Sequence, residues 1–175
     1  ILQFQHDLNV EYKNPEESPL TPQEQEEFKG HSFYPIDSTY RVVAQFRKIE
    51  GPEEIQFPTS SGAIKTYDTY ALATFELKGN TYQLPVYQSH ALRQMEEYKD
   101  YLFLPFTDYT SGVETYGAGR YIDLRIPEGN TIVIDFNKAY NPFCAYIPNY
   151  SCPIPPEAND LKLEVNAGIR GPEGN

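Results

Sequence analysis

Two short stretches in which apolar and polar residues alternate, residues 121–126 and 131–136, constrain the fold of this chain most strongly. Both stretches are rich in β-branched and aromatic residues, and the turn-forming segment PEGN (residues 127–130) separates them. Alternation with a period of two is typical of a half-buried β-strand, and turn residues between two such stretches favour a tight reversal of the chain. The pattern therefore predicts a β-hairpin over residues 121–136.

A three-residue loop, residues 128–130, would place all the apolar residues of this hairpin on one face. A shift by one residue would mix the two faces, so the pattern itself selects the register. The opposite face would carry Asp123 across from Asp135, and Arg125 could offset the repulsion between these carboxylates. The facing apolar pairs in this register are Ile126 with Ile132, Leu124 with Ile134 and Ile122 with Phe136.

Further short β-rich runs separated by turn residues extend along the rest of the chain. Strands that recur at intervals of roughly 8–12 residues are typical of antiparallel sandwiches and barrels. Pro85 lies inside one run and demotes that strand to a sheet edge or a bulge. Because strands do not alternate with long helices here, we predict a mainly β fold, a single antiparallel sandwich or barrel. The runs cover residues 40–46, 54–57, 70–77, 81–87, 101–106 and 161–165, and the runs 70–77 and 81–87, on either side of Gly79-Asn80, are a candidate second hairpin.

One or two short helices are predicted near the N-terminus. Thr21, followed by Pro22 and Glu24, matches a capping box with proline in the first helical position. Gly30 is a typical residue after the end of such a helix. Apolar residues with helical spacing also indicate a short amphipathic helix before it, and these residues are Ile1, Leu2, Phe4, Leu8 and Tyr12.

The length of 175 residues fits a single folded domain. We divide the chain into an acidic N-terminal segment that packs on the domain (1–30), the β domain (31–168) and a frayed tail (169–175). The net charge of −11 argues against nucleic acid and anionic membrane surfaces as partners, and no apolar run approaches the roughly 20 residues of a membrane span. No spacing of histidines, cysteines or carboxylates indicates a metal or a cofactor.

The predicted hairpin would bring two polar segments, rich in glycine and asparagine, together at its open end. Residues 108–119 enter the first strand there, and residues 139–146 leave the second strand. Loops held by a rigid scaffold are frequent positions for binding groups. We therefore predict a pocket for a small molecule that carries an anionic or hydroxyl-rich group. Its candidate residues are Glu114, Tyr116, Arg120, Asn137, Tyr140, Asn141 and Cys144.

The same residues permit other interpretations. The Arg120 guanidinium is suited to a carboxylate or phosphate of a ligand, but it would equally form a buried pair with Glu114. Cys144 would serve a hydrolase or transferase as nucleophile if a base lay nearby, and a carboxylate would serve such an enzyme as acid or base. Cys144 would otherwise be buried, or would pair with Cys152 if the protein is exported. A structural or interaction module, whose motifs serve folding alone, is the third hypothesis.

Three segments of the chain resemble a known protein family. They read LFLPFTDYTSGVETYGAGRY (102–121), DFNKAYNPFCAY (135–146) and CPIPP (152–156). In these segments the chain resembles the domain-of-unknown-function family 1684 of bacteria and archaea, and the similarity extends from about residue 18 to residue 168. The resemblance implies no activity, because none is established for the family. Members similar to this chain often carry an export signal, which implies an extracytoplasmic location, either periplasmic or secreted.

The chain departs from the family pattern at one place. Members tend to have Glu-Asn after the double proline and one further residue, where this chain has Ala158 and Asn159. Glu157 lies one position earlier, so the role of that glutamate is either moved to Glu157 or lost. The chain also begins at Ile1 without an initiator methionine, which makes the removal of an upstream segment, such as an export signal, an expectation.

Overall fold

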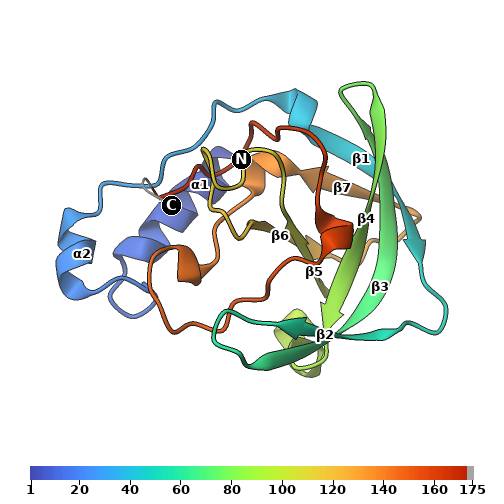
Figure 1. The fold of residues 1–175 in the computed structure, drawn as a ribbon, viewed down its shortest axis with the longest axis horizontal. Coiled ribbons are helices and arrows are strands. Elements are labelled where there is room, and N and C mark those ends of the chain that lie inside the picture. The colour runs from blue at the N-terminus through green and yellow to red at the C-terminus, as the bar shows by residue number, and fades with distance from the viewer. Residues whose placement is uncertain (173–175) are drawn as a thin grey trace.

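Seven antiparallel strands form one curled sheet that wraps into a half-barrel (Figure 1). The structure, a computed structural model, describes residues 1–172. The order across the sheet is β6-β5-β4-β3-β1-β7, and β2 pairs with β3 outside this path. This architecture confirms the prediction of a mainly β, antiparallel fold. The strands are β1 (Arg41–Lys48), β2 (Glu54–Pro58), β3 (Ile64–Leu77), β4 (Asn80–Ser89), β5 (Tyr101–Phe106), β6 (Arg120–Arg125) and β7 (Thr131–Asp135).

The inner face of the curled sheet carries the main hydrophobic core. In β4 and β5 the side chains alternate between this core and a second, aromatic cluster on the outer face, because successive residues of a strand point to opposite sides. Val86 contacts the main core, whereas its neighbour Tyr87 belongs to the outer cluster. The outer cluster supplies part of the wall of the pocket described below. It consists of Phe57, Tyr67, Tyr87, Phe103 and Tyr121.

The strands β3 and β4 form the second hairpin that the sequence predicts. Leu77 pairs with Asn80 at its end, and the two residues between them, Lys78 and Gly79, have φ values of 51° and 84°. Two consecutive residues with positive φ are typical of the type I′ turn, whose twist matches that of the flanking strands. Glycine adopts this conformation without strain, which explains why the turn falls at Gly79.

Pro85, which we expected at a sheet edge or a bulge, lies where β4 separates from β5. The two strands are joined by a single residue pair, Tyr87 with Phe103. Pro105 of β5 also lacks a backbone N–H, so a regular ladder cannot form between the two prolines. The side chain of Asn159 fills this gap, because its Nδ2 donates to the carbonyl oxygens of Pro85 and Pro105 at 3.0 and 2.9 Å. Pro85 is therefore paired with β3 on one side but has no backbone pairing with β5 on the other, as at the edge of a sheet.

The hairpin predicted over residues 121–136 is wrong. β6 pairs with β5, and β7 pairs with β1. The two strands therefore lie at opposite ends of the sheet order, and residues 126–130 cross between them at the opening of the half-barrel. The predicted inward face is nevertheless correct, since an alternating strand buries the same side chains whichever neighbour it pairs with. The buried residues on this face are Ile122, Leu124, Ile132, Ile134 and Phe136.

The C-terminal part of the chain differs from the prediction in two ways. Residues 161–165 do not form a strand. They run beside the loop after β5, where the Val165 N–H donates to the Asp108 carboxylate at 2.7 Å instead of to a neighbouring strand. The start of the expected frayed tail is packed, because Ile169 is 1% exposed and forms a β-bridge with Phe33. Residues 173–175 of that tail lie outside the described residues.

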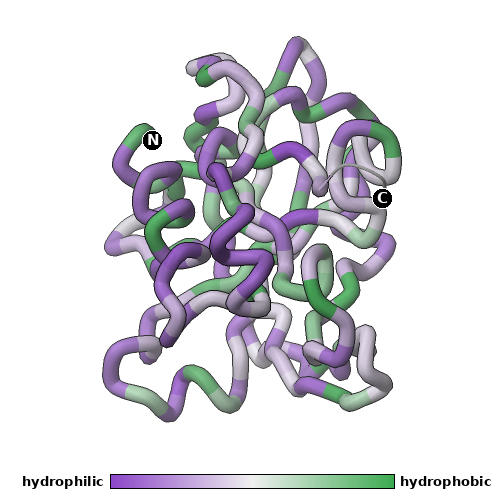
Figure 2. Tube along the Cα trace, turned by 90° about the vertical axis from the view of Figure 1, so that its left-hand side faces the viewer, coloured by the Kyte–Doolittle hydropathy of each residue, from purple (hydrophilic) through white to green (hydrophobic). Residues whose placement is uncertain are grey.

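Both predicted N-terminal helices are present. The Thr21 hydroxyl accepts a hydrogen bond from the Glu24 N–H, and the Glu24 carboxylate accepts one from the Thr21 N–H, which completes the capping box. Seen from the side of the helices, the segment nearest the viewer, which includes α2, is mostly hydrophilic (Figure 2). α1 instead buries Leu8 and Tyr12 against Ile169 in a third cluster. The helices are α1 (Leu2–Lys13) and α2 (Pro22–Glu27), with the 3-10 turns η1 (Ser38–Tyr40), η2 (Leu92–Gln94), η3 (Glu96–Tyr98), η4 (Phe136–Lys138), η5 (Phe143–Ala145) and η6 (Glu157–Asn159).

His31 joins the N-terminal helices to the domain. Its ring packs edge-on against Tyr12 and Phe28, with centroid distances of 4.2 and 4.9 Å. Its Nε2 is buried without a hydrogen-bond partner within the described residues. Burial among these rings lowers the pKa of His31 from 6.5 to about 4, because the charged imidazolium is poorly solvated there.

We expect His31 to make the protein less stable in acid. The unfolded chain takes up a proton as the pH falls through 6.5, whereas the folded protein does so only near pH 4, so acid favours the unfolded chain. This difference lowers the free energy of unfolding by about 2 kcal/mol between about pH 7.5 and pH 4.5. Urea denaturation of the wild type and His31→Gln at both pH values measures it, and the variant is expected to lose less stability. His6→Gln, at an exposed position of α1, is the matched control; equal losses in all three proteins would contradict this role for His31.

Candidate functional site

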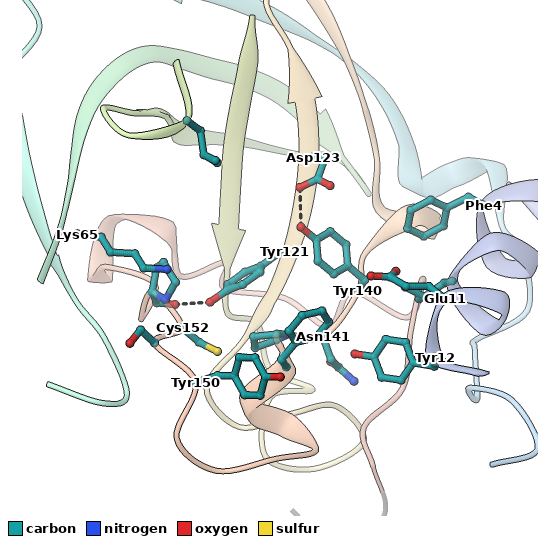
Figure 3. A pocket seen from close by; sticks show the side chains of 16 residues that line it. Phe4, Glu11, Tyr12, Lys65, Tyr121, Asp123, Tyr140, Asn141, Tyr150 and Cys152 are labelled. Carbon is teal, nitrogen blue, oxygen red and sulfur yellow. Dashed lines mark hydrogen bonds between the residues drawn. The ribbon is translucent and has the colours of Figure 1, made fainter. Parts of the chain in front are cut away.

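A pocket of about 520 Å³ lies on the outer face of β6, between α1 and the segment that follows β7 (Figure 3). This volume is within the ~300–1,000 Å³ that is typical of small-molecule sites. We call it the aromatic pocket, because six aromatic side chains line it together with three charged ones. The aromatic residues are Phe4, Tyr12, Tyr121, Tyr140, Phe143 and Tyr150, and the charged residues are Glu11, Lys65 and Asp123.

One face of α1 forms a wall of the pocket. Phe4, Leu8 and Glu11 follow one another at helical spacing, so they lie on the same face of the helix. The buried side chains of Leu8 and Tyr12 fix this face against the domain. Phe4 packs on the Tyr140 ring with a centroid distance of 6.5 Å. The helix thereby holds the Glu11 carboxylate and the Tyr12 hydroxyl at the pocket, as Figure 3 shows.

Asp123 is the hydrogen-bonded centre of the opposite wall. Its Oδ1 accepts hydrogen bonds from the Tyr140 hydroxyl at 2.5 Å and the Tyr101 hydroxyl at 2.7 Å. Burial, reinforced by the negative charge of Asp123, raises the pKa of both tyrosines, so both hydroxyls stay protonated and remain donors. Asp123 Oδ2 accepts no hydrogen bond from the residues that the structure describes. This oxygen is therefore available to a ligand.

Two further oxygen acceptors belong to this pocket. Burial, followed by the charges of Glu17 and Asp123, raises the pKa of Glu11, so the Glu11 and Asp123 carboxylates are near enough to repel each other. Asn141 is 2% exposed, and its Nδ2 donates to the Tyr146 hydroxyl at 2.9 Å. Its Oδ1 is buried and accepts no hydrogen bond within residues 1–172. Asn141 Oδ1 is too deeply buried for a ligand to reach, so the carboxylates of Glu11 and Asp123 are the charged acceptors that the pocket offers.

A disulfide bond between Cys144 and Cys152 closes the wall that lies across from α1 in Figure 3. Within the loop that it closes, Tyr150 packs edge-on against Phe143 with a centroid distance of 5.4 Å. Ser60 ties this loop to the chain between β2 and β3, because its hydroxyl donates to the Tyr150 carbonyl at 2.7 Å. The oxidised Cys144 has no thiol, so this form of the protein cannot use it as the nucleophile of a hydrolase or transferase.

Arg120, the centre of the predicted site, lies inside the protein. Its side chain is fully buried and forms an ion pair with Asp108 at 3.5 Å, rather than with Glu114. Its guanidinium also donates to the carbonyl oxygens of residues 165, 167 and 169. Beside Arg120, Gly119 lets the chain lie close to the end of β5, because a Cβ there would lie 2.6 Å from the Phe106 carbonyl oxygen. These contacts connect the loop after β5 to the C-terminal segment. The guanidinium is closed to a ligand because it is fully buried, although its Nε has no hydrogen-bond partner within residues 1–172.

Of the other predicted residues, three lie at the pocket and three lie elsewhere in the fold. Tyr140 and Asn141 line the aromatic pocket, and Cys144 is joined to its wall through the disulfide. Glu114 accepts a hydrogen bond from the Tyr34 hydroxyl at 2.6 Å, away from the pocket. Asn137 is buried and bonds to the backbone of Asp37. Tyr116 is half-buried and does not line the pocket.

The two carboxylates that we expected to face each other are far from that arrangement. Asp123 lies on the outer face of β6, whereas Asp135 caps η4 through the Asn137 N–H at 3.0 Å.

Where the chain departs from the family pattern, after the double proline, Glu157 and Ala158 are both exposed. Asn159, which matches the family pattern, is instead completely buried.

The residues that α1 contributes to the pocket, chiefly Glu11 and Tyr12, are not among those predicted from the sequence. A signal was present, because Glu11 follows the apolar residues Phe4 and Leu8 at helical spacing and so interrupts the face that packs on the domain. A charged residue on such a face indicates a cavity or a partner for its charge. No sequence signal placed α1 beside β6, since more than 100 residues separate them.

The comparison with known proteins identifies the family. The sequence profile of DUF1684, proteins of unknown function, matches residues 26–170. The chain belongs to this family. This DUF1684 protein is similar to an uncharacterised protein from Haloarcula marismortui whose structure was solved by solution NMR. The two sequences are 34% identical, and the two structures superpose with a TM-score of 0.76. The match covers 99% of this chain and 94% of that chain. None of the curated proteins compared with the chain is similar to it.

These matches confirm the resemblance that the motifs carry, although the family profile begins at residue 26 and not near residue 18. α1 precedes the matched range, whereas the likeness to the Haloarcula protein spans nearly the whole chain. Within residues 1–172, no helix has the length and the apolar character needed to cross a membrane. The same residues contain no group of three or more histidine, cysteine or carboxylate side chains arranged to hold a metal ion.

Proposed function

We propose that this DUF1684 protein binds a hydroxyl-rich small molecule in the aromatic pocket. The observation that carries the proposal is Asp123, whose Oδ1 is held by two tyrosine hydroxyls while its Oδ2 is left for a ligand, in a pocket lined by six aromatic rings. Sugars and polyols present a C–H surface with hydroxyl groups along its edge. Aromatic rings pack on such a surface, and fixed acceptors select the hydroxyl groups.

The charges of the pocket favour this class over an anionic ligand. Glu11 and Asp123 line it together with Lys65, so its formal charge is negative when all three groups are ionised. Figure 3 shows Lys65 on the opposite side of the pocket from Glu11, and neither carboxylate forms an ion pair with it among the described residues. An anion would be repelled by two carboxylates, whereas neutral hydroxyl groups can donate to them.

Another hollow, of about 620 Å³, lies beside the aromatic pocket and shares Lys65 with it. Its lining includes His90, whose Nε2 lies 2.7 Å from Asp68 Oδ1. Arg93 occupies the other oxygen of Asp68 at 2.8 Å. Because these charges pair with one another, they offer less to a ligand than the unpaired carboxylates of the aromatic pocket.

Replacing Tyr150 with alanine tests the proposal. Tyr150 is 39% exposed and forms one wall of the pocket, so its removal affects the ligand surface more than the core. We expect the affinity for a bound saccharide to fall about 10-fold, since one ring contact is lost. Isothermal titration calorimetry with a panel of monosaccharides, disaccharides and polyols identifies the ligand in the wild type and then measures the variant.

Tyr109→Ala is the matched control for this experiment. Tyr109 is also exposed, at 58%, but it does not line the pocket. The control is expected to bind as the wild type does. If no member of the panel binds the wild type, or if both variants bind as tightly as it does, the aromatic pocket is not a saccharide or polyol site.

We further propose an extracytoplasmic location, periplasmic or secreted. The disulfide between Cys144 and Cys152 supports this proposal, because such bonds persist mainly in oxidising compartments. The wall of the pocket contains this bond, so reducing conditions would loosen the loop that carries Tyr150. Fractionation of cells that produce the protein, with thiol labelling before and after reduction, tests both location and oxidation state.

A further inference from the structure

We propose that a small-molecule thiol regulates the aromatic pocket by attacking the disulfide at Cys152 and so releasing the wall that Tyr150 forms. The regulation of ligand binding rests on the proposed function, whereas the exchange at the disulfide needs no saccharide. Three features of the wall across from α1 support it. They are the place of Cys152 in the pocket lining, the unpaired cation of Lys65, and the contacts of the Ser60 hydroxyl with both the disulfide and Tyr150.

The two sulfurs of the disulfide differ in their access to the pocket. Cys152 belongs to the lining of the pocket, whereas Cys144 does not. Figure 3 shows the Cys152 sulfur among the side chains of that lining. In thiol–disulfide exchange a thiolate attacks one sulfur and the other sulfur leaves. A thiol in the pocket therefore attacks Cys152, and Cys144 is the leaving group.

The exchange is balanced by the thiol itself. The thiol first loses its proton to water. Its sulfur then forms a bond to Cys152 Sγ while the bond between Cys152 and Cys144 breaks, and the electron pair of the broken bond stays on Cys144. The products are a mixed disulfide on Cys152 and a thiolate at Cys144, so no other oxidant or reductant is needed.

Lys65 provides a charge that favours the incoming thiolate. It lines the pocket and lies across from α1 in Figure 3, on the same side as Cys152 and opposite Glu11. Its ammonium group forms no ion pair within residues 1–172. A nearby cation stabilises a thiolate relative to the thiol, and the thiolate is the form that attacks a disulfide.

The Ser60 hydroxyl connects the disulfide to Tyr150. Its Oγ lies 3.0 Å from Cys144 Sγ and donates to the Tyr150 carbonyl oxygen at 2.7 Å. A hydroxyl has a single proton, so it donates to one of these two atoms at a time. In the disulfide the sulfur is uncharged, but a thiolate is a charged acceptor and forms a stronger hydrogen bond than a carbonyl does. Release of Cys144 therefore draws the Ser60 hydroxyl away from Tyr150.

The rest of the loop allows Tyr150 to move once these connections are lost. The Cys152 end stays attached, because the Ser60 N–H donates to the Cys152 carbonyl oxygen at 3.2 Å. Residues 148–150 are exposed. Tyr150 keeps its ring contact with Phe143 at 5.4 Å, but it loses both the covalent closure of the loop and the bond to its carbonyl. The exchange thus loosens one wall of the pocket and leaves the anchor of the loop in place.

Mass spectrometry tests the exchange. The protein is incubated with reduced glutathione or, separately, with L-cysteine, and free thiols are then trapped with N-ethylmaleimide before digestion. We expect the added thiol on Cys152 and the maleimide on Cys144. NMR relaxation of the Tyr150 amide, without a saccharide, measures the release of the wall. Calorimetry with the panel of monosaccharides, disaccharides and polyols, before and after exchange, measures the effect on binding.

Ser60→Ala tests the role of the hydroxyl, and Ser61→Ala is the matched control. The Ser61 hydroxyl bonds to Ser151 Oγ at 2.6 Å and contacts neither sulfur. We expect Ser60→Ala to exchange about 10-fold more slowly than the wild type, because the leaving thiolate lacks a hydrogen bond, and Ser61→Ala to exchange at the rate of the wild type. A purely structural role of Ser60 predicts the opposite, since a looser loop would exchange faster.

After exchange we expect a more mobile Tyr150 amide and an affinity for the bound saccharide about 10-fold lower, as in Tyr150→Ala, because the same ring contact is lost. The added thiol on Cys144, the absence of a mixed disulfide, or Ser60→Ala exchanging as fast as the wild type would overturn the proposal. Unchanged mobility of Tyr150, or saccharide binding that exchange leaves as tight as before, would overturn the regulation and leave the saccharide site standing. Exchange at Cys152 that mobilises Tyr150, in a protein that binds no member of the panel, would support the thiol site and overturn the saccharide site.

Discussion

Replacing Arg120 with methionine is expected to lower the free energy of unfolding by about 3–5 kcal/mol, the usual cost of removing one partner from a buried ion pair. Methionine keeps much of the volume of the side chain, so the effect reports the charge and the hydrogen bonds rather than a cavity. Asp108 would be left as a buried carboxylate without its cation. Urea denaturation, with circular dichroism as the readout, measures the change.

The size of this effect follows from the number of groups that Arg120 joins. Arg120 Nη1 donates to the carbonyl oxygens of Ala167 and Ile169 at 2.6 and 3.1 Å, and Nη2 donates to that of Val165 at 3.0 Å. All three carbonyls belong to one segment that has no strand of its own to pair with. Without the guanidinium these acceptors would stay buried and unsatisfied, each at a cost of about 1–3 kcal/mol unless the segment moves to reach water.

Two further variants separate this explanation from a general sensitivity of the protein to the loss of arginine. Arg125→Met removes an arginine whose ion pair with Asp100 is half-exposed, and it is expected to cost less than about 1 kcal/mol. Asp108→Asn combined with Arg120→Met should recover part of the loss, because the unpaired charge is no longer present. If Arg120→Met were as stable as Arg125→Met, the buried pair would not hold the C-terminal segment.

The same geometry explains why the sequence could not decide between a ligand-binding and a structural role for Arg120. The glycine before it, Gly119, lets the backbone lie close to the Phe106 carbonyl oxygen, and such an approach suits a binding loop and a structural one equally. The acceptors that use the guanidinium lie 45–49 residues further along the chain, from the last residue of the alternating run 161–165 onward. Nothing in the local sequence distinguishes a carbonyl of the protein from the oxygen of a ligand.

The error in the hairpin of residues 121–136 has a related cause. Alternation determines which side chains face the core, and this part of the prediction holds for both strands. It contains no information about the neighbouring strand, because an alternating strand presents the same two faces to any partner. In contrast, the hairpin at Gly79 and the capping box at Thr21 are specified by adjacent residues, and both were predictable. Local chemistry was therefore readable from the sequence, whereas partners distant in sequence were not.

The aromatic pocket illustrates this limit for the candidate site. Tyr140 and Asn141 were predicted from their motif, but the predicted neighbours Arg120 and Asn137 are buried inside the protein and do not line the pocket. The residues that complete the pocket come from α1 and from the disulfide loop, which meet only through the packing of the third cluster. Position in a motif thus located one side of the pocket. The opposite side depends on tertiary contacts.

Replacing Asn159 with leucine is expected to lower the free energy of unfolding by about 3 kcal/mol, because three buried polar groups lose their partner. Asn159 Nδ2 donates to the carbonyl oxygens of Pro85 and Pro105, and its Oδ1 accepts from the Tyr87 hydroxyl at 2.7 Å. Leucine has nearly the same shape but offers no hydrogen bond. Chemical denaturation of the variant measures the loss, and Asn130→Leu, at an exposed position, is the matched control with an expected cost below about 0.5 kcal/mol.

Tyr87→Phe resolves the contribution of Oδ1 from that of Nδ2. This variant removes one hydrogen bond of Asn159 and is expected to cost about 1 kcal/mol, leaving both proline carbonyls satisfied. A cycle of both single variants and the double variant then gives the coupling between the two side chains. Strong coupling with a large cost for Asn159→Leu would mean that this asparagine replaces the missing ladder between β4 and β5. A cost for Asn159→Leu no larger than that of Tyr87→Phe would mean that water satisfies the carbonyls in the gap, and that the prolines need no side chain to close it.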